Sequence, residues 1–186
     1  MDGNKENEKL CPLLFALLPG KSEVLYSEFF NIINSLAMAR GKTIMWKKIV
    51  MDFESASRNA FKKFLPRLNI WGCYFHFCPC LYNYVQRNKV LNRMYRMESS
   101  VLYNLVRDFM LIAFCANGYV MDGFIRVLEF YMCYYEVFMR QSVVKKFILY
   151  FYKQWMVNPN LSTDIWNVYE RGRIRTNYFL EGYHTV

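Results

Sequence analysis

The pattern of apolar and polar positions along the chain changes character near Asn92. Before that point, three short runs rich in apolar residues stand between proline, glycine and charged residues: Leu13–Leu18, Lys47–Met51 and Leu68–Cys73. Runs of this length with such boundaries are typical of buried strands. The first part of the chain therefore predicts three strands.

Helical patterns lie between and after these runs. Ser22 and Ser55 are placed to cap the first two predicted helices, Pro66 ends the second, and a third helix extends to about Gln86. Strands that alternate with helices favour a mainly parallel sheet covered by helices. We therefore expect an α/β fold that is rich in helix.

The second part of the chain predicts about three helices and contains no strand signal. Their apolar faces are formed by residues spaced three or four apart within Leu102–Ile112, Phe124–Phe138 and Val144–Trp155. This helical segment covers residues 92–158, approximately, and differs from the alternating elements before it.

The composition is that of one domain with a large core. The chain has 186 residues, of which 54% are hydrophobic and 19% are aromatic, more than most soluble domains carry. This excess indicates apolar surface that a partner covers, or a fragment of something larger. We expect residues 1–11 to be disordered and residues 12–186 to form the domain.

The charge balance indicates a polyanionic partner. A formal net charge of +9 and a pI near 9.3 favour nucleic acid first and an anionic membrane surface second. A basic protein without such a partner is the plain alternative. We find no apolar run typical of a transmembrane span, and the six cysteines without a signal peptide favour reduced thiols in the cytosol or nucleus.

Two acids, Asp52 and Glu54, directly follow the second predicted strand. Carboxylates at the carboxyl end of a strand can hold magnesium or manganese, which prefer oxygen ligands. Alternatively, an acid beside the start of the helix at Ser55 gains roughly 0.3–1 kcal/mol from the helix dipole. Taken alone, these residues favour the second interpretation.

The segment "GCYFHFCPC" places Cys73 and His76 three positions apart, with Cys78 and Cys80 close behind. Four such side chains could bind zinc, but their spacing is irregular. Free cysteines are also among the most buried residues, so core packing is favoured over zinc. A Cys/His pair that serves an active site is the third possibility.

Several basic residues flank aromatic residues, an arrangement that can follow the phosphates of a nucleic acid. Ordinary solvated helix faces are the alternative explanation. The predicted DNA contacts are Lys47, Lys48, Lys62, Lys63, Arg87, Arg171, Arg173 and Arg175.

Five stretches together resemble the transposase domain of Mutator-like elements (MULE). They are "FALLPGKSEVLYSEFFNII", "IVMDFESASRNAFKKFLPRLNIWGCYFHF", "LYFYKQWM", "WNVY" and "RTNYFLEGYH", and their order and spacing are specific. The resemblance extends from about residue 12 to the end. It implies a ribonuclease-H-like core with a helical insertion before the last motif.

The resemblance also implies metal-dependent phosphodiester cleavage and strand transfer. Such chemistry uses two aspartates and one glutamate to hold two magnesium or manganese ions. Asp52 matches the family's second aspartate and Glu181 the region of its final glutamate, so both are implied catalytic residues and metal ligands. The supporting residues implied by the motifs are Cys73, His76, Asn177 and His184.

The family's first aspartate lies on an earlier strand that is missing from this sequence. We therefore expect an N-terminally truncated core in which cleavage is lost and the ion is not bound productively. The leading hypothesis is a nuclear, transposon-derived fragment that binds DNA, with a protein partner over its apolar surface and no membrane association. The alternatives are a domesticated protein-interaction module without DNA binding, and an active transposase domain if the true start lies upstream.

Overall fold

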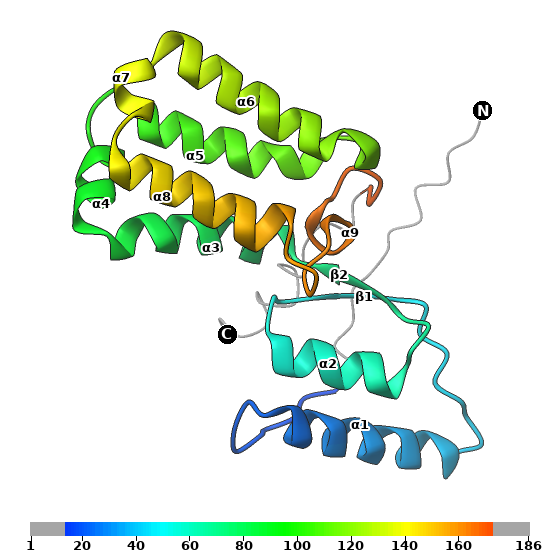
Figure 1. The fold of residues 1–186 in the computed structure, drawn as a ribbon. Coiled ribbons are helices and arrows are strands. Elements are labelled where there is room, and N and C mark those ends of the chain that lie inside the picture. Colours follow the sequence, from blue (N-terminus) through cyan, green and yellow to red (C-terminus); the bar gives the residue numbers. More distant parts are fainter. Residues whose placement is uncertain (1–13, 173–186) are drawn as a thin grey trace, which may run out of the picture.

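The computed structural model describes residues 14–172, which form an α-rich α/β structure. Its parallel strands are β1 (Lys48–Met51) and β2 (Asn69–Gly72). Its helices are α1 (Glu23–Met38), α2 (Ser55–Phe64), α3 (Tyr74–Arg87), α4 (Lys89–Tyr95), α5 (Val101–Leu111), α6 (Val120–Tyr134), α7 (Glu136–Met139), α8 (Ser142–Phe151) and α9 (Thr163–Trp166). Figure 1 shows α1 and α2 on one side of the sheet and the longer helices of the second half on the other.

The αβ unit, which we define as α1, β1, α2 and β2, is built around a parallel strand pair. Lys48 pairs with Asn69 and Met51 with Gly72, and α2 connects the two strands as a crossover. α1 packs on the outer face of α2, where the ring of Phe30 lies 4.0 Å from that of Phe61. The buried core of this unit consists of Phe30, Met51, Ala60, Phe61, Leu68 and Ile70.

The predicted helix starts of the αβ unit are close to those observed. The Ser22 side chain accepts a hydrogen bond from the Leu25 backbone N–H at 3.3 Å, which confirms the first predicted cap. The second cap is wrong by one residue, because Glu54 occupies the cap position and Ser55 is already helical. The helix ends at Phe64, before Pro66, as predicted.

The predicted strand over Leu13–Leu18 is wrong for the residues that the structure describes, 14–18. They have no strand conformation, and Leu17 is fully exposed. Within residues 14–172 the sheet consists of β1 and β2, and no neighbouring strand supplies the hydrogen bonds that would hold this segment extended. The ribonuclease-H-like arrangement of strands stays a prediction.

The helical block, which we define as α3 to α9, surrounds a second and larger core. The three helices expected from the sequence correspond to α5, α6 and α8, and α3 joins them through Phe77, Leu81 and Val85. A π-helical turn, Tyr152–Met156, follows α8 and places Trp155 against α9. There the indole N–H of Trp166 donates to the Trp155 carbonyl oxygen at 2.8 Å.

The two regions meet at the end of β2. A Cβ atom added at Gly72 would lie 2.3 Å from the ring of Phe53 and 3.0 Å from the Ile165 carbonyl oxygen. Glycine is therefore required here because α9 and the Phe53 ring press against the backbone. Within residues 14–172, no helix is both long and apolar enough to cross a membrane.

Candidate functional site at the carboxyl ends of the strands

Residues predicted from the sequence meet at the carboxyl ends of β1 and β2. Asp52 directly follows β1, and Cys73 directly follows β2. Because the strands are parallel, both positions lie at the same edge of the sheet, which is the edge where α/β proteins usually bind ligands. The amino-terminal ends of α2 and α3 also lie at this edge, and their dipoles favour negative charge there.

Asp52 and His76 are in direct contact. The carboxylate Oδ1 of Asp52 lies 3.0 Å from Nδ1 of His76, and their side chains are 50% and 31% exposed. The sequence singled out both residues but did not predict that they touch. The order of elements in the sequence contained the information for this contact. Asp52 follows one strand of a parallel pair, and His76 lies in the first turn of α3, which follows the other strand.

Cys73 is fully buried and holds the start of α3 in place. Its backbone N–H donates to the Met51 carbonyl oxygen at 2.8 Å, which extends the strand pairing by one residue. Its own carbonyl oxygen accepts from the N–H groups of His76 and Phe77, both at 3.0 Å. The backbone of Cys73 therefore fixes where the His76 side chain stands relative to β1.

The two cysteines that follow are partly buried on α3. Burial raises the pKa of the Cys78 thiol and, together with the charge of Asp52, that of Cys80. Both thiols are therefore protonated at neutral pH. In the part of the chain that the structure describes, no three His, Cys, Asp or Glu side chains stand together as a metal-binding group.

Glu54 connects the start of α2 to α1. The Tyr26 hydroxyl donates to Oε2 of Glu54 at 3.0 Å, while the Glu54 side chain makes no hydrogen bond to the helix that it precedes. Burial and this bond to the carboxylate raise the pKa of Tyr26. Glu54 thus stands beside a helix start, as the sequence indicated, but its carboxylate is engaged by another helix.

Arg171 locks the end of the helical block onto β2. It is 6% exposed, and its guanidinium donates to the carbonyl oxygens of Gly72, Asp164 and Ile165 at 2.7, 2.9 and 2.8 Å. It also lies over the indole of Trp71, 5.0 Å from the ring centre. Burial lowers the pKa of Arg171 to about 10, so it stays charged at neutral pH. We assign it this structural role in place of the predicted phosphate contact.

The predicted lysine contacts lie at the opposite edge of the sheet. Lys47 and Lys48 stand at the start of β1, and Lys62 and Lys63 lie in the last turn of α2, which leads to the start of β2. All four are exposed, and Lys63 forms an ion pair with Glu23. A four-residue strand spans about 13 Å, so these cations lie roughly that far from the Asp52 edge.

The remaining predicted residues are placed differently. Arg87 is exposed at the end of α3, more than two helical turns beyond His76. The others lie outside the described residues: Arg173, Arg175, Asn177, Glu181 and His184. The structure therefore brings together Asp52, Cys73 and His76 from the predicted site.

A family comparison covers the same part of the chain. The sequence model of the family described as "MULE transposase domain" matches residues 2–79. This range contains α1, the β1–α2–β2 crossover and the first turn of α3, and it includes Asp52, Cys73 and His76. The match confirms the resemblance found in the sequence motifs over these residues. No curated protein and no solved structure matches the chain.

Proposed function

We propose that this chain, whose residues 2–79 match the sequence model of the MULE transposase domain family, derives from a transposon, binds DNA in the nucleus and does not cut it. The observation that carries the proposal is the group of exposed lysines at the amino ends of β1 and β2. We call this group the lysine edge and define it as Lys47, Lys48, Lys62 and Lys63.

The lysine edge has a strongly positive local charge. The sequence contains no acidic residue in 40–51 or in 55–68, the segments that supply these lysines. Among its members, only Lys63 has a carboxylate partner within the described residues, and that partner is Glu23. Exposed cations without nearby carboxylates attract phosphates and release the counterions around them, which is the main source of nonspecific DNA affinity.

The carboxyl edge of the sheet supports binding without cleavage. Two divalent ions need several carboxylates to neutralise them. Within residues 14–172 this edge provides the Asp52 carboxylate beside the His76 imidazole, while Glu54 accepts a hydrogen bond from Tyr26. The described part of this edge therefore lacks the further carboxylates that two magnesium or manganese ions need, and Glu181, the other implied ligand, lies outside the described residues.

DNA binding is tested by salt titration of duplex affinity, for example by fluorescence anisotropy. Changing Lys47, Lys48 and Lys62 to Gln is expected to weaken binding at low salt. Each lost phosphate contact reduces the steepness of the fall of log K with log salt by about 0.9. The matched control changes Lys145, Lys146 and Lys153 to Gln, which removes the same charge from exposed positions on α8 and the turn after it. Equal losses in both triple variants, or no binding by the unchanged protein, contradict the proposal.

The absence of cleavage is tested separately with supercoiled DNA and magnesium or manganese. The unchanged protein is expected to leave the DNA intact at concentrations that saturate binding. Cleavage that disappears in Asp52→Ala, while that variant still binds DNA, would show that Asp52 serves a working metal site.

A protein-interaction module is the second candidate function. It is favoured by exposed apolar side chains around the end of α6 and the start of α7, where Tyr134 and Val137 are 69% and 81% exposed. Such a surface is suited to a protein partner. This candidate predicts no DNA affinity even at low salt, so the same titration distinguishes the two.

A further inference from the structure

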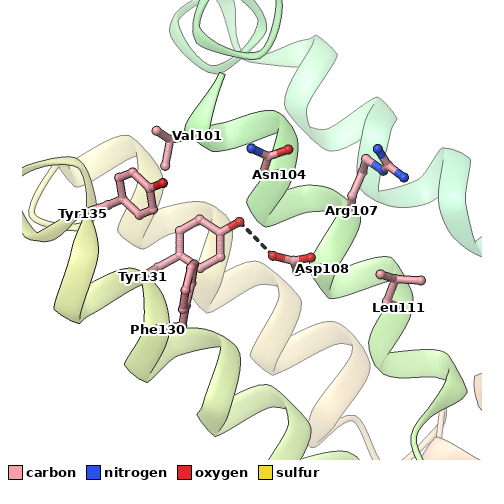
Figure 2. Close-up of a pocket in the computed structure, with 8 residues that line it drawn as sticks. All are labelled: Val101, Asn104, Arg107, Asp108, Leu111, Phe130, Tyr131 and Tyr135. Carbon is pink, nitrogen blue, oxygen red and sulfur yellow. Dashed lines mark hydrogen bonds between the residues drawn. The ribbon is translucent and has the colours of Figure 1, made fainter. Parts of the chain in front are cut away.

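A pocket of about 300 Å³ lies between α5 and the end of α6. Its α5 wall carries Asn104, Arg107 and Asp108, as Figure 2 shows. The facing wall is aromatic and consists of Phe130, Tyr131 and Tyr135. The pocket belongs to the helical block and is separate from both edges of the sheet.

One hydrogen bond orders two polar side chains of the pocket, and other polar groups are available to an occupant. The Tyr131 hydroxyl donates to Oδ2 of Asp108 at 2.8 Å, as the dashed line in Figure 2 marks. Burial, with the neighbouring carboxylate, raises the pKa of Tyr131, so the hydroxyl keeps its proton. Among the described residues, Oδ1 of Asp108 and the Asn104 amide have no hydrogen-bond partner. The pocket therefore offers both donors and acceptors.

The aromatic wall gives the pocket a surface for stacking. Ring centres lie 5.3 Å apart for Phe130 and Tyr131, and 5.6 Å apart for Tyr131 and Tyr135. Phe130 and Tyr135 are 50% and 40% exposed, so their rings are accessible. Arg107 and Asp108 balance each other in charge, which disfavours a free phosphate. A planar ring with donors and acceptors on its edge, such as a nucleobase, fits these features.

The surface beside the pocket carries alternating aromatic rings and cations. The guanidinium of Arg107 lies over the ring of Tyr103 at 5.5 Å. The rings continue from Tyr103 to Tyr95 at 5.2 Å and from Tyr95 to Tyr82 at 5.4 Å, across α5, α4 and α3. The exposed cations on α4 and directly after it are Lys89, Arg93 and Arg96. Aromatic rings interleaved with cations are the usual means of binding unpaired nucleic acid, because bases stack and phosphates pair.

We propose that the α5–α6 pocket receives a single unstacked base of DNA, whose flanking phosphates lie along Arg93 on α4 and Arg96 directly after it. The base stacks on Tyr135 and Phe130 and forms hydrogen bonds with Asn104 and Asp108. This inference rests on the proposed DNA binding and adds a preference for distorted or unpaired DNA to it.

The test compares two duplexes that differ in one group. One carries a single bulged nucleotide, and the other carries an abasic nucleotide at the same bulge, so that charge and distortion are matched. A stacked base contributes enough for about a tenfold preference for the bulged base. The preference should fall below about twofold in Asn104→Ala and in Tyr135→Ala. The control is Tyr119→Ala, which should keep the preference for the bulged base. Tyr119 is exposed and directly precedes the start of α6, at the end of this helix away from the pocket.

The outcomes separate this inference from the proposed function. Equal affinity for the two bulged duplexes overturns the base pocket but leaves DNA binding intact. A preference that survives in both pocket variants, with unchanged thermal melting, places the base elsewhere and also overturns it. No affinity for any of the duplexes overturns both proposals. A preference lost in the pocket variants and kept in Tyr119→Ala supports the pocket.

Discussion

Phe30 in the αβ unit and Phe109 in the helical block are the centres of two cores of very different extent. Phe30 belongs to a core of six buried apolar residues, whereas Phe109 belongs to one of twenty-two within the described part of the chain. The smaller core carries the family match and the Asp52–His76 contact, while almost all of the larger core lies beyond residue 79. We therefore expect the region with the family match to be the less stable one and to depend on the helical block for support.

The largest predicted effect is in the larger core. Phe109→Ala removes a fully buried ring whose centre lies 4.4 Å from Phe151 and 5.6 Å from both Phe124 and Phe147. The expected loss in the free energy of unfolding is about 3–5 kcal/mol, because close-packed helices cannot fill the cavity. Urea unfolding measures it. Phe30→Ala is the matched change in the αβ unit and should cost less, and a larger loss there would reverse the comparison.

The next largest effect is at the junction between the two regions. Arg171→Ala leaves the carbonyl oxygens of Gly72, Asp164 and Ile165 without their donor and should cost about 2–4 kcal/mol. Arg171→Lys should restore only part of this, since an ammonium cannot reproduce the planar fork. The rate of backbone hydrogen exchange is expected to rise first in β1 and β2. Unchanged exchange in the αβ unit would show that the hydrogen bonds of Arg171 do not stabilise this unit.

A smaller effect is expected from Gly72→Ala. The added methyl group meets the Phe53 ring and the Ile165 carbonyl, so the helical block must shift from the sheet at a cost of about 1–3 kcal/mol. The double variant Gly72→Ala with Phe53→Leu should recover part of the loss in thermal unfolding experiments. If the second change recovers nothing, the close contact is not with the Phe53 ring.

The smallest expected effect comes from removing one tyrosine hydroxyl in each region. Tyr131→Phe removes the hydrogen bond to Asp108, and Tyr26→Phe removes the one to Glu54. Each loss should be about 1 kcal/mol, and it should be larger for the more buried Tyr131. Equal or reversed losses in urea unfolding would contradict the ranking.

The same tyrosines predict a pH dependence. The pKa values of Tyr26 and Tyr131 are both raised above the ordinary value of 10.0 in the folded protein. Their contribution to stability is therefore complete below pH 10 and is lost as the pH rises through the folded pKa values. Stability measured from pH 8 to 11 should fall less steeply in each Phe variant than in the unchanged protein.

Local signals predicted local structure well. The Ser22 cap, the end of α2 before Pro66 and the strand at Lys48–Met51 depend on neighbours within a few residues, and all three are observed. The residues 14–18 show the limit, because an apolar run becomes a strand only where a neighbouring strand accepts its hydrogen bonds.

The sequence predicted which residues belong to the candidate site, but it did not predict the contacts that they make. Asp52 and His76 could be singled out from the sequence, and the parallel pairing of β1 and β2 then brings them together. The inward position of Arg171 could not be predicted, since its guanidinium donates to Gly72, which lies 99 positions earlier in the chain. Long-range packing decided whether this basic residue faces solvent or the core.

The central claim is that DNA lies along the lysine edge of the αβ unit, and lysine footprinting tests it most directly. The protein is acetylated briefly with and without a saturating DNA duplex, and the modification of each lysine is measured by mass spectrometry. DNA is expected to protect Lys47, Lys48 and Lys62, while Lys145 and Lys146 on α8 react equally in both samples. Protection of the α8 lysines with full reactivity at the lysine edge would contradict the account.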